Sequence, residues 1–477
     1  MIKIARIAVT LGLLSSLGAQ AYAAGLVVND NDLRNDLAWL SDRGVIHLSL
    51  STWPLSQEEI ARALKKAKPS YSSEQVVLAR INQRLSALKA DFRVTGYTST
   101  DQPGTPQGFG QTQPADNSLG LAFNNSGEWW DIHLQGNVEG GERISNGSRF
   151  NANGAYGAVK FWNQWLSFGQ VPQWWGPGYE GSLIRGDAAR PMTGFLMQRA
   201  VQAAPETWWL RWIGPWQYQI SASQMNQYTA VPHTKIIGGR LTFSPFQSLE
   251  LGASRIMQWG GEGRPQSFSS FWDGFTGQDN TGTDNEPGNQ LAGFDFKFKL
   301  EPTLGWPISV YGQMVGEDEA GYLPSANMYL AGVEGHHAWG KNAVNWYVET
   351  HDTRDDRSRT DYIYTHHIYK DGYYQQGYPL GDAMGGDGQL VAGKVELVTE
   401  DNQRWSTRLV YAKVNPENQL INKAFPHSDT LKGVQLGWSG DVYKSVRLNT
   451  NLWYTNADNS DSDDIGASAG IEIPFSL

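Results

Sequence analysis

The chain has 477 residues, a formal charge of −10 and no cysteine, which excludes a disulfide scaffold, thiolate metal sites and a cysteine nucleophile. Its 48 acidic residues outnumber 38 basic ones, which argues against a nucleic-acid partner. A mean hydropathy of −0.46 excludes a transmembrane helix beyond the N-terminus, yet 53 glycines, 20 tryptophans and 20 tyrosines are typical of a membrane β-barrel, in which alternate residues face lipid and water.

The first 23 residues are predicted to form a signal peptide for Sec-type export. Lys3 and Arg6 supply positive charge, residues 7–17 form a short apolar core, and Ala21-Tyr22-Ala23 gives the small-x-small cleavage pattern. The alternative is a retained anchor helix, which is disfavoured because the apolar run is short and Gln20 interrupts it. No cysteine follows, so a lipoprotein is not expected, and cleavage after Ala23 leaves a charge of −12, from 36 basic and 48 acidic residues.

Residues 24–90 have helical periodicity and are predicted to form a periplasmic plug. Leu33, Leu37 and Leu40 recur at helical spacing, and Ser56 with Glu59 resembles a capping box. A longer helix follows with its own apolar stripe, made of Val77, Ile81, Leu85 and Leu88. Short amphipathic helices need a partner, and the predicted partner is a barrel over residues 91–477.

From residue 91 onward the period changes to two. Phe294, Phe296 and Phe298 alternate with charged residues, as in strands that have one apolar and one polar face. The pattern predicts eighteen antiparallel strands between 92–98 and 464–477, one of them at 206–214. Short turns alternate with long segments, including 172–205, 258–289, 317–326 and 353–387, as expected of periplasmic turns opposite extracellular loops. An even number places both chain ends in the periplasm.

A soluble β-sandwich or propeller is the alternative fold. A sandwich does not require long loops to gather at one end, and the sequence has no repeated blade motif. One feature departs from the barrel pattern, because many outer-membrane barrels end on an aromatic residue whereas this chain ends Phe475-Ser476-Leu477.

Three long loops combine aromatic residues with arginines, a combination suited to carbohydrate. Aromatic faces stack on sugar rings, and arginine pairs with the carboxylates of acidic sugars. The candidate polysaccharide-binding residues are Trp174, Trp175, Tyr179, Arg185, Arg190, Arg264, Trp272, Arg354, Arg357, Arg359 and Tyr373. The alternative for the aromatics is a girdle at the membrane interfaces, which is favoured for Trp130, Trp208 and Trp453.

The sequence gives little support for catalysis, a metal or another cofactor. His336-His337 and His366-His367 are adjacent pairs, whose side chains would point to opposite faces of a strand. Residues 458–464 are acidic but lack EF-hand spacing, so a solvated loop is expected there. No nucleophile elbow, P-loop or zincin motif occurs.

The chain resembles the Wzi family of capsule-assembly outer-membrane proteins along its whole length. The resemblance rests on the export signal, on Asn31-Asp32-Leu33-Arg34-Asn35-Asp36-Leu37, on Gln173-Trp174-Trp175-Gly176-Pro177-Gly178 and on Ile471-Glu472-Ile473-Pro474-Phe475. It implies an eighteen-stranded barrel with a periplasmic helical plug. It also implies a non-catalytic lectin that attaches group 1 type capsular polysaccharide to the surface of a Gram-negative cell.

The expected partners follow from this resemblance. They are an acidic capsular polysaccharide and the lipid and lipopolysaccharide of the outer membrane, with a functional link to capsule-export machinery, and the barrel is expected to be a monomer. A sugar-selective diffusion porin is the alternative function, and bilayer conductance would separate the two. An enzyme, such as a deacylase or glycosidase, is a more distant alternative.

Overall fold

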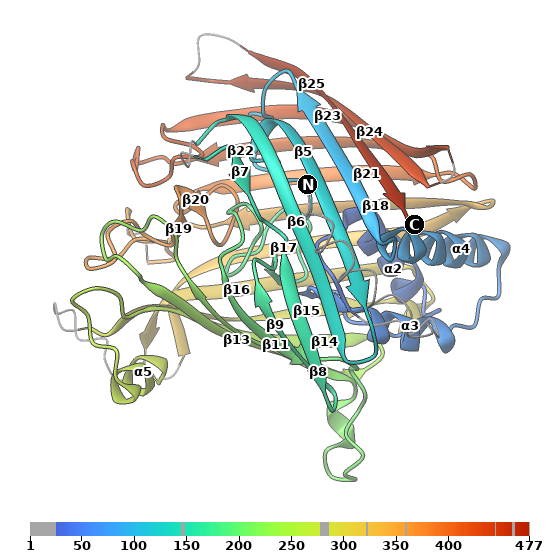
Figure 1. The fold of residues 1–477 in the computed structure, drawn as a ribbon, viewed down its shortest axis with the longest axis horizontal. Helices are drawn as coiled ribbons and strands as arrows, with labels where there is room; N and C mark the ends of the chain where they lie inside the picture. Colours follow the sequence, from blue (N-terminus) through green and yellow to red (C-terminus); the bar gives the residue numbers. More distant parts are fainter. Residues whose placement is uncertain are drawn as a thin grey trace, which may run out of the picture.

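The computed structural model describes residues 25–144, 148–276, 286–320, 323–357, 360–443, 445–459 and 463–476; the predicted signal peptide and Arg359 lie outside them. Its main body is a closed antiparallel barrel (Figure 1). The barrel strands are β4 (Phe92–Ser99), β5 (Ala115–Ser126), β6 (Trp130–Glu142), β7 (Phe150–Asn151), β8 (Tyr156–Phe161), β9 (Gln164–Gly169), β11 (Gly194–Arg199), β12 (Trp216–Gln224), β13 (Lys235–Phe246), β14 (Leu249–Trp259), β15 (Gly288–Lys299), β16 (Ile308–Ala320), β17 (Leu323–Trp339), β18 (Asn342–Asp352), β21 (Gln389–Val398), β22 (Arg404–Val414), β23 (Asp429–Tyr443), β24 (Val446–Ala457) and β25 (Asp464–Phe475).

The barrel closes where the last strand pairs with the first. Phe475 of β25 lies opposite Phe92 of β4, and their rings stack with centroids 5.4 Å apart. The closed sheet has nineteen segments in the described part of the chain, but β7 and β8 both pair with β6 and together occupy one position. Nineteen segments therefore make eighteen strand positions, which confirms the predicted barrel.

The predicted strand pattern is wrong in two regions of the barrel. Residues 206–214 form no strand; they contain only the short 3₁₀ helix η1 (Arg211–Ile213), and the missing strand is β11, inside the predicted loop 172–205. The alternation pattern does not predict β11, because its inward residue Leu196 is itself apolar and buried and the strand lacks a clear polar face. The predicted loop 317–326 is also wrong, since β16 and β17 continue to Ala320 and from Leu323.

The alternation of residues along each strand follows from two different surroundings. In β15, Phe294 and Phe296 are exposed on the outer wall, whereas Asp295 and Lys297 are buried in the lumen. An apolar outer face suits lipid, and the lumen can accept polar groups only if they find partners. Trp130 belongs to the exposed outer set, as a girdle residue should, but Trp453 faces inward and its indole N–H donates to Asp464 at 3.0 Å, so a girdle role for Trp453 is wrong.

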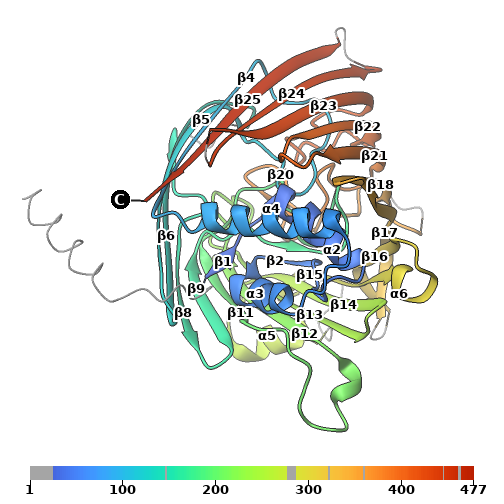
Figure 2. The ribbon, with the colours of Figure 1, turned by 90° about the vertical axis from the view of Figure 1, so that its right-hand side faces the viewer.

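Three helices of the N-terminal segment lie within the ring of strands (Figure 2). They are α2 (Asn31–Asp42), α3 (Gln57–Lys65) and α4 (Ser72–Leu88). The short strand β1 (Leu26–Val27) precedes α2, and β2 (Thr52–Trp53) and β3 (Leu55–Ser56) lie between α2 and α3. They occupy the end of the barrel at which the C-terminus and the short turns lie (Figure 1). None of the helices in the described part of the chain is both long and apolar enough to cross a membrane.

The apolar stripes of these helices form one core. Leu33, Leu37, Ile60, Val77 and Ile81 are buried in the same cluster, while Leu85 and Leu88 pack against its edge. Ser56 caps α3 by accepting the Glu58 N–H at 3.2 Å. Glu59 does not complete the predicted capping box, because its carboxylate binds Arg62 and accepts the backbone N–H of Gln202.

Buried polar contacts fix the helices to the lumen wall. Asp36 of α2 pairs with Arg80 of α4 at 2.7 Å and with Arg404 of β22. Burial raises the pKa of Asp36, but the two guanidinium groups outweigh this and hold it below the usual value. Arg84 of α4 pairs with Glu472 of β25 at 2.8 Å. Removing one member of such a buried pair typically costs about 3–5 kcal/mol, so each pair fixes the position of the helices.

Candidate functional site

Residues 170–193 leave β9, enter the lumen and return to β11. Their strand β10 (Trp174–Trp175) pairs with β2 of the N-terminal segment, which fixes both tryptophans. Trp174 packs edge-on against Phe109 at 5.3 Å, and the Trp175 indole N–H donates to Gln219 at 2.7 Å. Both rings are buried. The expectation that they stack on sugar in an open loop is not supported by this geometry, because polar and apolar protein groups already surround them.

Tyr179 is buried a few residues further along the same loop. Its ring stacks on Tyr347 with centroids 4.8 Å apart. The Glu349 carboxylate on β18 accepts the backbone N–H groups of Tyr179, Glu180 and Gly181 at 2.7, 2.9 and 3.2 Å. Since a loop in the lumen must satisfy its backbone donors, this carboxylate fixes the course of the loop.

Three more of the predicted binding residues also contact only other parts of the protein. Arg190 pairs with Glu139 at 2.6 Å and with Glu142 at 3.0 Å, and the Tyr373 hydroxyl donates to the Ile184 carbonyl at 2.8 Å. Arg185 lies buried beside Tyr373; burial lowers the pKa of its guanidinium, and the tyrosine offsets part of this. These side chains join loops to the wall and to one another, and in this arrangement none of them reaches the surface.

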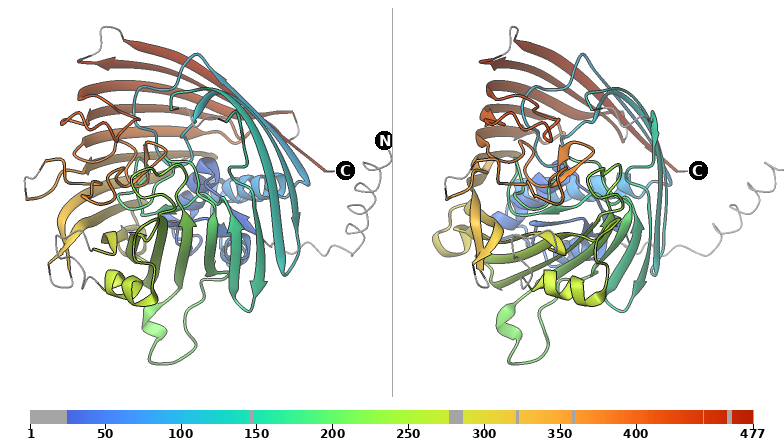
Figure 3. Two further views of the ribbon diagram at one scale, coloured as in Figure 1. Left: turned by 60° about the vertical axis from the view of Figure 1, so that its left-hand side comes forward. Right: turned by 90° about the vertical axis from the view of Figure 1, so that its left-hand side faces the viewer.

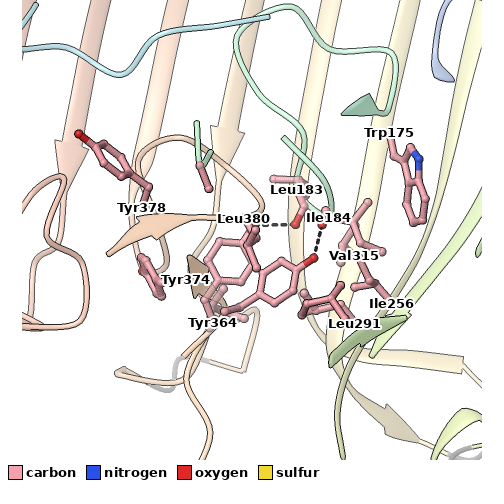
Figure 4. Close-up of a cluster of buried hydrophobic side chains, with 14 of the residues drawn as sticks. Trp175, Leu183, Ile184, Ile256, Leu291, Val315, Tyr364, Tyr374, Tyr378 and Leu380 are labelled. Carbon is pink, nitrogen blue, oxygen red and sulfur yellow. Dashed lines mark hydrogen bonds between the residues drawn. The ribbon is translucent and has the colours of Figure 1, made fainter. Parts of the chain in front are cut away.

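The long loop 353–388 folds over the segment 170–193 and covers the lumen from the extracellular end (Figure 3). It carries the short strands β19 (Tyr374–Gln375) and β20 (Tyr378–Pro379). The Tyr364 hydroxyl donates to the Leu183 carbonyl at 2.6 Å (Figure 4). The Gly186 N–H donates to the Leu380 carbonyl at 2.8 Å. The tyrosines of this loop are thus mostly core residues, and sugar stacking by them is not supported.

The remaining predicted arginines lie nearer to solvent. Arg354 is exposed and donates to Asp352 from Nε at 2.9 Å, and Arg357 is exposed on the same loop. Arg264 is half-buried and donates to the Glu286 carbonyl. Of the predicted arginines in the described residues, these three are the ones whose side chains are not buried.

Trp272 is exposed, but on the outer wall. It belongs to α5 (Phe268–Phe275), whose Phe271 packs edge-on against Trp259 at 5.8 Å and whose Gly274 carbonyl accepts from Arg255 at 3.4 Å. Trp259 and Arg255 are on the outward face of β14, since the alternate residue Ser254 contacts Arg240 in the lumen. Trp272 therefore faces the surroundings of the barrel at its extracellular end and not the lumen.

The two histidine pairs differ from each other. His336 is buried in the lumen and His337 stacks on Trp346, as adjacent residues of a strand should. His366 and His367 lie in a loop, so the expectation of opposite faces is wrong there; their rings stack at 4.5 Å beside Glu286. The Nδ1 atom of His366 accepts the N–H groups of Ile368 and Tyr369, and its Nε2 atom lies 3.4 Å from the Glu286 carboxylate.

A cavity of about 810 Å³ lies within the lumen of the described structure. It lies between the N-terminal segment and the wall formed by β4–β6 and β21–β25, and extends from Asp91 near the short turns to Arg143 and Phe425 at the extracellular loops. Its lining is polar and carries both charges. It contains amides, hydroxyls and cations, among them Gln102, Gln107, Gln113, Asn124, Ser406, Gln435, Asn449, Asn451, Ser468, Arg93 and Lys394, and the carboxylates of Asp30, Asp32, Asp91, Asp131, Glu396 and Glu472. Tyr97 and Tyr156 add aromatic rings.

Comparison with known proteins decides the family. The family described as "Capsule assembly protein Wzi" matches residues 89–468. The chain belongs to this family. It is 93% identical over its whole length to an "Uncharacterized 55.8 kDa protein in cps region" of Klebsiella pneumoniae, of which it covers 95%. It is also 89% identical to the solved structure of Wzi from Escherichia coli, titled an outer membrane protein involved in group 1 capsule assembly and a carbohydrate-binding β-barrel; the match covers 95% of this chain and 100% of that one, with a TM-score of 0.91.

Membership of the capsule assembly family places the barrel in the outer membrane. The structure also shows the position of one segment on which the sequence resemblance rests. The Trp174–Gly178 segment lies inside the barrel against α2, so its residues are needed for the fold of the loop and not for an exposed contact. Alternation along a strand identifies the inward polar residues, but it does not show which of them remain uncovered by other segments. It therefore does not predict this cavity.

Proposed function

We propose that this chain is a non-catalytic outer-membrane lectin that binds exported capsular polysaccharide and attaches the capsule to the cell surface. The observation that carries the proposal is the 89% identity, over 95% of the chain, to a carbohydrate-binding barrel of group 1 capsule assembly. A cavity lined by amides, hydroxyls and cations supports it, because pockets of about 300–1,000 Å³ commonly hold small ligands and sugars require many polar partners.

The exposed cations at the extracellular end are the proposed first contacts. Arg354 and Arg357 lie on the loop that covers the lumen, and Arg143 stands at the cavity mouth. An acidic polymer would pair with these guanidinium groups, and such exposed pairs weaken as salt screens them.

Binding of purified polysaccharide to the purified full-length barrel tests this function. Acidic capsular polymers of known repeat would be compared with a neutral polymer such as dextran. A variant carrying Arg354→Ala and Arg357→Ala should bind the acidic polymer more weakly and with less salt dependence. Arg211→Ala, an exposed arginine on the 200–215 loop, is the matched control. A wild-type barrel that retains no capsular polymer would refute the lectin function.

One observation favours a second candidate, a sugar-selective diffusion pore. The cavity has lining residues near both ends of the barrel, from Asp91 and Ser126 to Arg143 and Phe425. A continuous water path there would conduct ions. Conductance of the wild-type barrel in a planar bilayer separates the candidates, since stable open channels in every insertion would support a pore.

A further inference from the structure

Among the described residues that line the lumenal cavity, Lys394 is a buried lysine whose ammonium group has no protein partner. Lys394 on β21 faces the lumen, is only 9% exposed and lines the cavity. In the described part of the chain its Nζ atom makes no hydrogen bond, and no carboxylate lies within 4.0 Å of it. The Nζ atom is not itself fully buried, so it reaches the open space of the cavity, where an anion could pair with it.

The neighbouring carboxylates are already bound to other groups. Arg408, opposite Lys394 on β22, is held by Glu180 at 2.9 Å. Glu396, the next inward residue of β21, accepts from Asn345 at 3.0 Å and from Arg404 at 3.4 Å. The positive charge of Lys394 is therefore directed into the cavity.

We propose that the cavity is a subsite for an acidic sugar residue, whose carboxylate pairs with Lys394. This deepens the proposed lectin function and rests on it. The Tyr97 ring is placed on the lumenal face of β4 and can stack on the sugar, while the Gln435 and Asn451 amides can bond to its hydroxyls. Arg143, which donates to the Gln102 carbonyl at 2.7 Å, provides a second positive charge at the entrance.

The test compares two forms of one polymer on the full-length barrel. The probes are a purified uronic-acid-containing capsular polysaccharide and the same polymer after reduction of its carboxyl groups to alcohols. Lys394→Gln removes the charge and keeps a polar side chain, Lys394→Arg keeps the charge, and Lys341→Gln at an exposed turn is the control. Competition by inorganic phosphate distinguishes a general anion site from a carboxylate site within a sugar.

The subsite predicts that Lys394→Gln weakens binding of the acidic polymer about tenfold, which is about 1.4 kcal/mol. The carboxyl-reduced polymer should bind the variant and the wild type equally, and Lys394→Arg should restore affinity for the acidic form. Wild-type affinity of Lys394→Gln for the acidic polymer overturns the subsite and leaves the lectin function intact. Equal losses for both polymer forms overturn the charge pairing, as does full displacement of the acidic polymer by millimolar phosphate. No binding by the wild type overturns both proposals.

A second inference comes from residues 200–215, which connect β11 and β12 at the short-turn end. This loop projects away from the ring of strands in views from both ends (Figures 2 and 3). Its Trp208, Trp209 and Trp212 are 82%, 58% and 65% exposed. The adjacent turns of the wall also expose aromatic rings, Trp162 and Phe246, as expected at a membrane surface.

We infer that this loop lies in the headgroup region of the periplasmic leaflet and anchors the barrel in phospholipid. Three exposed indoles beside the lipid-facing wall are unfavourable in water, whereas indoles prefer the interface, where the ring is apolar and the N–H meets polar groups. Arg211 between them can reach lipid phosphates.

The absence of cysteine permits single-site labelling. Trp208→Cys would carry an environment-sensitive fluorophore in liposomes containing interfacially spin-labelled phosphatidylcholine. Trp162→Cys on the wall is the lipid reference, and Tyr71→Cys beside α4 is the aqueous reference. Quenching of the Trp208→Cys label by spin-labelled lipid, as at position 162, supports the anchor. Quenching by aqueous iodide as at position 71, or protection from both quenchers, refutes phospholipid as the occupant.

Discussion

Arg34 of α2 lies over the ring of Tyr179, with its guanidinium carbon 4.5 Å from the ring centroid. The same guanidinium donates to the carbonyl oxygens of Pro177 and Gly178 at 2.9 and 2.8 Å. Two of the segments on which the family resemblance rests, residues 31–37 and 173–178, therefore bind each other inside the barrel. Arg34 connects the N-terminal helices with the loop that lies above them.

Replacing Arg34 should loosen this loop. Hydrogen bonds from a charged donor contribute about 1.5–3 kcal/mol each, and Arg34→Ala leaves two buried carbonyls without their donor. Backbone amides of residues 174–186 should then exchange hydrogen about 30-fold faster, corresponding to about 2 kcal/mol of local stability. Lys66→Ala, on the exposed end of α3, is the control. Unchanged exchange in Arg34→Ala would show that Glu349 alone holds the loop.

The N-terminal segment is proposed to close the periplasmic end. Deleting residues 25–90 would empty that end of the lumen and expose Arg404 and Lys297 to water, which replaces their lost partners. The deletion variant should still insert and should conduct ions at several times the wild-type level in planar bilayers. Deletion of residues 266–276, which removes α5 from the outer wall, should leave conductance unchanged. Low conductance of the 25–90 deletion would contradict the plug.

The stability of the loop assembly should depend on pH through Asp187. Burial raises the pKa of this carboxyl to about 6, although Gly110 and Asn29 donate hydrogen bonds to it at 2.8 Å. Because the pKa of Asp187 is higher in the folded than in the unfolded protein, its protonated form stabilises the folded state. This stabilisation is fully present below about pH 4 and is lost as the pH rises through about 6.

Asp187→Asn mimics the protonated form and should remove that part of the pH dependence. Between pH 5 and pH 7.5 the wild type should lose about 0.5–1 kcal/mol more than the variant, a figure reduced because Asp187 is partly exposed. Thermal unfolding of both proteins in detergent at the two pH values measures the difference. Parallel pH dependence in the two proteins would rule out Asp187 as the titrating group.

Capsule retention should depend on polymer length. A single sugar site open to water should bind at about millimolar affinity, near −4 kcal/mol, but a repeating polymer that meets many barrels can gain about 10²–10⁴ in avidity. Oligosaccharides of one or two repeats should bind isolated barrels weakly, and long polymer should leave barrel-dense membranes slowly. Surface plasmon resonance at low and high barrel density measures both. Equal affinity for short and long chains at both densities would contradict multivalent retention.

The sequence by itself determined the class of the fold and the positions of most of its strands. Each strand has one face toward lipid and the other toward the lumen, and alternation such as Phe294-Asp295-Phe296 indicates this within a single strand. Helical stripes such as Leu33 and Leu37 likewise required a buried face. Where both faces of a strand carry apolar residues, as in Gly194–Arg199, this signal disappeared and the strand was missed.

The tertiary structure decided which polar and aromatic residues remain accessible. The residue types expected of a sugar site are present in Trp175, Tyr179, Arg190 and Tyr373. The loops fold into the closed barrel, however, and place these side chains against protein partners. Lys394 looks like any other inward residue of a strand, and only the positions of Glu180 and Glu396 leave it without a partner. Such pairing joins groups hundreds of residues apart, and it depends on how the loops fill the lumen, which local periodicity does not encode.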